Sequence, residues 1–106
     1  MDGYTTKPIQ EVDKKLFTSE IRLPVIIHQH ALDHLSNKQR KIFKEQELLE
    51  MVEKERPRKA YLQQNGRYAV FYRRVDGYRK IILDIEETKT IIVSFMDTPE
   101  IPKYKI

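Results

Sequence analysis

Apolar and polar residues alternate over most of the stretch between residues 59 and 96, as is typical of β-strands. Two dipeptides, Asn65-Gly66 and Asp76-Gly77, interrupt this alternation. Such dipeptides favour tight hairpin turns, because a type I′ turn needs a positive φ at both central residues. A polar run follows later and marks a third turn. The pattern therefore predicts four strands, at residues 59–64, 67–75, 78–86 and 90–96.

The segment before these strands carries apolar residues at helical spacing. Three helices are predicted, over residues 8–18, 30–40 and 43–55. Pro57 ends the last of them, because the residue before a proline avoids the α region. A β-branched run at residues 25–27 indicates a short additional edge strand.

Together these elements predict an α+β fold, with two or three N-terminal helices packed on a four-stranded antiparallel meander sheet. The single domain is expected to span residues 8–98. Residues 1–7 are polar and are expected to be flexible. Residues 99–106 contain two prolines, which forbid a helix, so an extended tail is expected there.

The Asp76-Gly77 turn sets the expected pairing of the two central strands. Arg74 would then lie opposite Arg79, and Arg73 opposite Lys80. Like charges in such positions cost up to about 1 kcal/mol a pair. Three arrangements would relieve this repulsion: side chains that spread into water, a bound anion such as RNA phosphate, or internal salt bridges to acids such as Glu50 or Glu53. The same pairing predicts a core face made of Tyr68, Val70, Tyr72, Ile81, Leu83 and Ile85.

The opposite face of the predicted sheet mixes apolar residues with charged ones. It is therefore expected to be covered in part, by the first helix or by a second subunit. The last strand alternates large side chains at Ile91, Val93 and Phe95, and this predicts that all three face the main core. These expectations depend on the register, because a slip of one residue exchanges the two faces.

Composition narrows the classes of function. The chain of 106 residues has no cysteine, which excludes disulfides and thiolate metal sites. No apolar run approaches the roughly 18 residues of a membrane span, and no signal peptide is recognisable, so a cytoplasmic location is expected. The formal net charge of +4 favours an anionic partner such as nucleic acid.

Three histidines lie close together, at His28, His30 and His34. His30 and His34 are four residues apart and share a face of the predicted helix. Three roles are open to them: polar surface residues, proton transfer near neutral pH, or metal ligation with His28 as a third ligand. No Glu lies between the pair as in the metalloprotease motif. No metal or other cofactor is therefore expected.

The chain has no serine nucleophile elbow, phosphate loop or dinucleotide fingerprint. A metal-independent ribonuclease needs less: an acid or base near the 2′-hydroxyl, cations for the phosphate and an aromatic ring to stack a base. A histidine and the central hairpin supply such a set. The residues expected to contact RNA are Arg67, Tyr72, Arg74 and Lys80.

The run His30-Ala31-Leu32-Asp33-His34, the helix ending at Pro57 and the hairpin at Asp76-Gly77 resemble the RelE, barnase and colicin type of ribonuclease toxins. Phage-associated and uncharacterised toxin-like members belong to the same group. The resemblance covers about residues 25–98. It implies an α+β fold, and it implies active-site roles for His30, Arg73, Arg79 and Ser94.

The favoured hypothesis is a toxin-like, metal-independent endoribonuclease that cleaves single-stranded RNA by internal attack of a 2′-hydroxyl. Histidine would transfer protons, and Arg73 or Arg79 would stabilise the phosphorane charge. Two alternatives are open: a non-catalytic module that forms a homodimer or binds a protein such as an antitoxin, and RNA or DNA binding without cleavage. No membrane partner is expected.

Overall fold

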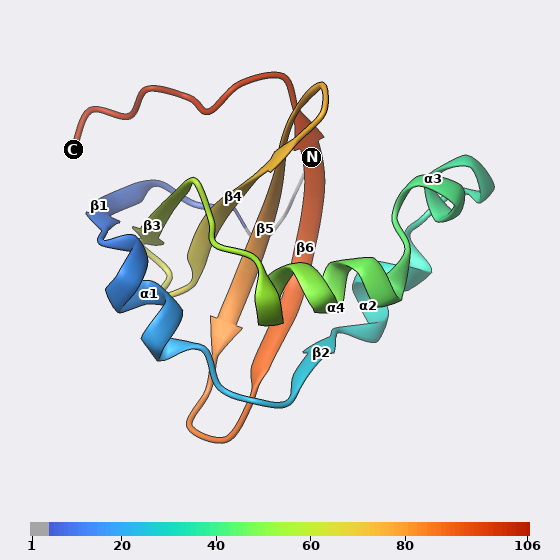
Figure 1. Cartoon of the computed structure of the whole chain (residues 1–106), viewed down its shortest axis with the longest axis horizontal. Coiled ribbons are helices and arrows are strands. Elements are labelled where there is room, and N and C mark those ends of the chain that lie inside the picture. The colour runs from blue at the N-terminus through green and yellow to red at the C-terminus, as the bar shows by residue number, and fades with distance from the viewer. Residues whose placement is uncertain (1–4) are drawn as a thin grey trace.

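The computed structural model describes residues 5–106, and its strands form one six-stranded sheet in the order β1-β3-β4-β5-β6-β2 (Figure 1). The strands are β1 (Pro8–Val12), β2 (Val25–Ile27), β3 (Lys59–Gln63), β4 (Tyr68–Arg74), β5 (Gly77–Ile85) and β6 (Thr90–Thr98). The helices are α1 (Lys14–Glu20), α2 (Gln29–Asp33), α3 (Asn37–Ile42) and α4 (Glu45–Lys54). Of residues 1–7, which are expected to be flexible, residues 1–4 lie outside the described residues.

The prediction of a four-stranded antiparallel meander is wrong for the sheet as a whole. β3, β4, β5 and β6 do follow one another in antiparallel order, but β1 adds to β3 on one side. On the other side β2 pairs in parallel with β6, so the sheet is mixed. The expected strand at residues 25–27 is therefore confirmed, and it extends the sheet rather than standing apart from it.

The first predicted helix is wrong over residues 8–12, which form β1. The apolar spacing there suits either structure, and pairing with β3 supplies backbone hydrogen bonds that an isolated short helix cannot match. α1 begins only after Asp13, whose carboxylate accepts hydrogen bonds from the backbone N–H groups of Lys15 and Leu16.

The helix predicted over residues 30–40 is two helices, α2 and α3. Ser36 starts the second one with a capping box, in which its hydroxyl accepts from the Gln39 backbone and the Gln39 side chain accepts from the Ser36 backbone. The helix predicted over residues 43–55 is confirmed as α4. Over residues 5–106, none of the helices has the length and apolar character that a membrane crossing requires.

The main core lies between the helices and one face of the sheet. Phe17 of α1 and Leu48 of α4 are fully enclosed in it, with 1% and 0% of their surfaces exposed. The predicted core face is confirmed, since its six side chains belong to or pack against this cluster: Tyr68, Val70, Tyr72, Ile81, Leu83 and Ile85.

The register of the β4–β5 hairpin differs from the prediction. Arg74 pairs with Gly77, so Val75 and Asp76 are the two central residues of the turn. Relative to the expected pairing, β5 is shifted by two residues, which keeps every side chain on its predicted face. The like-charge pairs disappear, because Arg79 now lies opposite Tyr72.

Gly77 serves a different purpose from the one its dipeptide predicts. It has a φ of 152°, and a Cβ atom there would lie 2.6 Å from the backbone oxygen of Thr98. No residue other than glycine has a positive φ between residues 5 and 106, so the turn itself is not of type I′. Glycine is needed at this position because the end of β6 passes so close to the hairpin.

The prediction for the last strand is wrong for two of its three large side chains. A register shift between Ile82 and Leu83 divides β6. Phe95 contacts Phe43 on the main core side, with ring centroids 5.0 Å apart. Ile91 and Val93 belong to a second cluster on the opposite face, together with Ala69 and Ile82.

That opposite face is covered in part by the C-terminal tail, and not by the first helix, which packs on the main core through Phe17. The ring of Tyr104 lies edge-on to Tyr61 at 4.9 Å, and Tyr61 in turn contacts Phe71 at 6.0 Å. Figure 1 shows the tail returning from the end of β6 towards β1. The tail of the chain therefore covers a part of this face.

Candidate functional site

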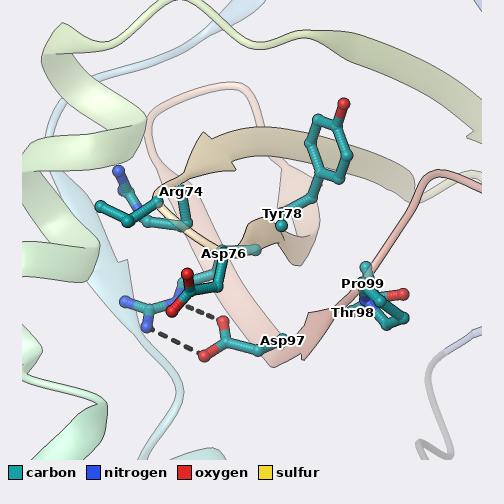
Figure 2. A pocket seen from close by; sticks show the side chains of 9 residues that line it. Arg74, Asp76, Tyr78, Asp97, Thr98 and Pro99 are labelled. Carbon is teal, nitrogen blue, oxygen red and sulfur yellow. Dashed lines mark hydrogen bonds and ion pairs between the residues drawn. The ribbon is translucent and has the colours of Figure 1, made fainter.

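A pocket of about 480 Å³ opens beside the β4–β5 turn and the end of β6 (Figure 2). Its volume lies within the roughly 300–1,000 Å³ range of ligand pockets. Two of the predicted site residues, Arg74 and Arg79, line it. The complete lining is Arg74, Val75, Asp76, Gly77, Tyr78, Arg79, Asp97, Thr98 and Pro99.

Arg79 is almost fully buried, with 5% of its surface exposed. Its Nε and Nη2 atoms donate to the two oxygens of Asp97 at 2.8 and 3.2 Å, the bonds drawn as dashed lines ending on Asp97 in Figure 2. Its Nη1 atom donates to Glu47 at 2.6 Å, and the guanidinium lies 4.8 Å from the ring centre of Phe43. Arg79, which lies on β5, therefore connects α4 with β6.

These contacts also fix the charge of Arg79. Burial acts to lower the pKa of the guanidinium, but the hydrogen bonds and charges of Asp97 and Glu47 outweigh it and raise that pKa above its usual value. The three hydrogen bonds use three of the five N–H groups of the guanidinium, and two carboxylates already balance its charge. The predicted role of Arg79 in stabilising a phosphorane stays a prediction.

Arg74 is also paired within the chain. Its Nη1 and Nη2 atoms donate to the two carboxylate oxygens of Glu55 at 3.3 and 3.2 Å. The pocket thus combines two guanidinium groups with the carboxylates that hold them, and Asp76 adds a further negative charge. Internal salt bridges, and not a free cationic surface, are what these two arginines form.

Tyr72 pairs with Arg79 across β4 and β5 and belongs to the main core, with 1% of its surface exposed. Within residues 5–106 its hydroxyl has no hydrogen-bond partner. Burial raises the pKa of this hydroxyl above its usual value, the nearby Glu55 adds to the effect, and Arg74 opposes it. A ring enclosed in this way cannot stack on an RNA base.

Removing the Tyr72 hydroxyl tests this description. We expect Tyr72→Phe to leave the free energy of unfolding unchanged or to raise it by up to about 1 kcal/mol, because a buried unpaired hydroxyl is costly. Urea denaturation followed by circular dichroism measures the change. A loss of more than about 1 kcal/mol would mean that the hydroxyl has a partner.

The remaining predicted hairpin residues are spread across the sheet. The Arg73 guanidinium lies 5.1 Å from the ring centre of Tyr78 and donates to the backbone oxygen of Gly77. Ser94 pairs with Ile82, whose side chain belongs to the second cluster, so it lies on the face opposite Arg79. Arg67 approaches Asp84 at the other end of β4, with 3.9 Å between Nε and Oδ2. Lys80 donates to Thr5 at 3.2 Å.

His30 lies on α2, outside the pocket lining. Its Nε2 atom is 2.8 Å from Nε2 of His34, and the two rings are nearly perpendicular at 86°. His28 caps the helix by accepting a hydrogen bond from the His30 backbone at 3.1 Å. The structure therefore brings the histidines together with one another, but it does not bring His30 into the pocket that contains Arg79.

A second basic region, which the sequence analysis did not single out, lies on α3 and the residue that precedes α4. We call residues 37–44 the α3 basic segment. Figure 1 shows α3 projecting to one side of the molecule. The segment contains no acid, and its basic side chains are all exposed: Lys38, Arg40, Lys41 and Lys44. The signal for it was present in the sequence, as a run of basic residues without an intervening acid.

Arg40 has a structural part in this segment, since it donates to the backbone oxygens of Leu32 and Leu35 and so ties α3 to α2. Lys38, Lys41 and Lys44 form no ion pair in the part of the chain that the structure describes. Their charge is therefore available to an external anion.

Comparison of the chain with protein-family models, with curated proteins and with solved structures finds no match in any of the three. The resemblance to the RelE, barnase and colicin type of ribonuclease toxins thus stays a prediction. Across residues 5–106, no group of three or more His, Cys, Asp or Glu side chains is arranged to hold a metal ion.

Proposed function

We propose that the protein binds nucleic acid through the α3 basic segment, with single-stranded RNA as the expected ligand. The observation that carries the proposal is a set of three exposed lysines, two on the projecting α3 and one just before α4, that form no ion pair with any residue between 5 and 106. Lysines in such a position neutralise phosphates and release counterions, which supplies most of the affinity of sequence-independent binding.

The charges around the pocket beside the β4–β5 turn favour RNA binding at the α3 basic segment over RNA binding at the central hairpin, which the sequence predicts. The two arginines of the pocket face Glu47, Glu55 and Asp97, and Asp76 lies beside them. Within the pocket lining, Asp76 and Asp97 balance Arg74 and Arg79, so the pocket has no excess of cations to attract a phosphate backbone. The α3 basic segment has the opposite balance, with four basic residues and no acid.

The test compares two triple variants that remove the same charge. We expect Lys38→Ala/Lys41→Ala/Lys44→Ala to weaken binding of a labelled single-stranded RNA at least about tenfold at low salt. The matched control is Lys14→Ala/Lys15→Ala/Lys103→Ala, which removes three exposed lysines elsewhere and is expected to change affinity about twofold or less. Fluorescence anisotropy measures both.

Salt dependence gives an independent measure in the same assay. Three phosphate contacts on a single strand predict a slope of about −2 when the logarithm of the binding constant is plotted against that of salt concentration. The slope for Lys38→Ala/Lys41→Ala/Lys44→Ala should be close to zero. Equal losses in the two triple variants, or affinity that does not change with salt, would contradict the proposal.

Cleavage of RNA, the activity that the resemblance implies, remains a separate proposal and is followed in the same samples. Binding without cleavage has more support, because Arg79 is occupied by carboxylates and Ser94 lies on the other face of the sheet. Incubation with EDTA and gel analysis distinguishes the two. Intact RNA favours a binding module, whereas cleavage that disappears in His30→Ala would favour the metal-independent ribonuclease.

A further inference from the structure

The imidazole rings of His30 and His34 converge on one point at the surface of α2. Their Nε2 atoms are 2.8 Å apart, and the ring centroids are 4.2 Å apart. Both side chains are exposed, so neither is held in place by core packing. At this separation one Nε2 atom donates its proton to the other. When the donor ring takes the tautomer with its proton on Nδ1, this hydrogen bond is lost and both Nε2 lone pairs become available to the same external group.

We propose that His30 and His34 form a two-ligand site for a divalent transition-metal ion of the Zn²⁺ or Ni²⁺ type. Imidazole nitrogen is a preferred ligand of these ions, and histidines four residues apart on a helix are a recurrent way to present two of them. At metal–nitrogen distances of about 2.0–2.1 Å, two ligands of a tetrahedral ion lie about 3.4 Å apart. The two exposed side chains need to separate by only about half an ångström to reach this spacing.

The neighbouring polar groups define how many ligands the chain provides. The Nδ1 atom of His28 accepts the hydrogen bond from the His30 backbone, so that ring serves as the cap of α2. Asp33 accepts from the side chain of Gln29 at 2.9 Å. Both hydrogen bonds stabilise the short helix α2, so we do not assign His28 or Asp33 as a metal ligand. Water therefore fills the remaining positions on the ion.

An ion held by two side chains and water is bound reversibly, and it adds positive charge to the side of the molecule that carries the α3 basic segment. The absence of a third protein ligand within residues 5–106 distinguishes the site from a structural zinc centre. The proposal does not depend on nucleic-acid binding, because it uses none of the lysines.

Isothermal titration of the metal-free full chain with ZnCl₂ tests the site. We expect one ion per chain, and we expect His30→Gln and His34→Gln each to weaken binding at least about tenfold. The matched control is His28→Asn, in which an amide oxygen keeps the cap of α2, and its affinity should stay within about twofold of the wild type. Circular dichroism confirms that each variant folds.

A second readout is independent of the titration heat. In proton–nitrogen correlation spectra, Zn²⁺ should shift the amide signals of residues 28–36 and leave those of the β4–β5 turn unchanged. The proposal is overturned if no binding occurs up to about 1 mM Zn²⁺, or if the two glutamine variants bind as tightly as the wild type. A loss in His28→Asn equal to that in the other variants would overturn it as well.

Discussion

Replacing Arg79 with alanine is expected to lower the free energy of unfolding by about 2–4 kcal/mol. The guanidinium is buried between α4 and β6, and it holds Glu47 and Asp97 while lying against the Phe43 ring. The variant loses these contacts and leaves a cavity beneath the pocket. The expected loss stays below that of a fully buried ion pair, because Glu47 and Asp97 are about half exposed and regain water.

Arg74→Ala is the control for this measurement. Arg74 also pairs with a carboxylate, but its side chain is 28% exposed and its partner Glu55 is 44% exposed. Surface pairs of this kind contribute about 1 kcal/mol or less, so the control should unfold at a similar urea concentration to the wild type. If Arg79→Ala were as stable as Arg74→Ala, the structural role of Arg79 would be refuted. The catalytic role predicted for Arg79 would then be the favoured explanation.

Substituting alanine for Gly77 is expected to destabilise the protein by about 2–3 kcal/mol. The added methyl group would lie 2.6 Å from the backbone oxygen of Thr98, and the φ of 152° is one that other residues rarely adopt. Relief requires β6 or the start of the tail to move, because the atom that clashes belongs to the backbone. A decrease of roughly 10 °C or more in melting temperature is the corresponding result in a thermal scan.

Gly66→Ala separates the two causes. Gly66 also has a positive φ, of 85°, but a Cβ atom there would meet nothing within 4 Å. Its substitution should cost about 1 kcal/mol, the price of the backbone conformation alone. Equal losses at the two glycines would show that the close passage of Thr98 does not matter to stability.

The parts of the fold that sequence patterns predict well are those with local causes. Alternation with a period of two locates β3 to β6. It also places Val70 and Ile81 on the core face in both the expected and the observed register, because these differ by two residues. The capping box formed by Ser36 and Gln39 is a local signal too, and it marks the point at which the helix predicted over residues 30–40 divides into α2 and α3.

The parts that were missed depend on residues far apart in the chain. β1 is a strand because β3 lies beside it, and its own apolar spacing gives no sign of that partner. The environment of Arg79 comes from Glu47 on α4 and Asp97 on β6, so a charge count over the hairpin alone could not reveal that the arginine is neutralised. The need for glycine at position 77 likewise comes from Thr98, whose backbone oxygen would lie 2.6 Å from a Cβ atom there.

The arrangement of the sheet also has a consequence for the order in which the protein folds. The three hairpins that join β3 to β6 link neighbours in the chain and close short loops. Pairing of β2 with β6 brings Val25 beside Thr90, and pairing of β1 with β3 brings Val12 beside Ala60. Contacts of such long range form slowly. Pulse-labelled hydrogen exchange should therefore show amides of β4 and β5 protected first, with the two outer strands added last.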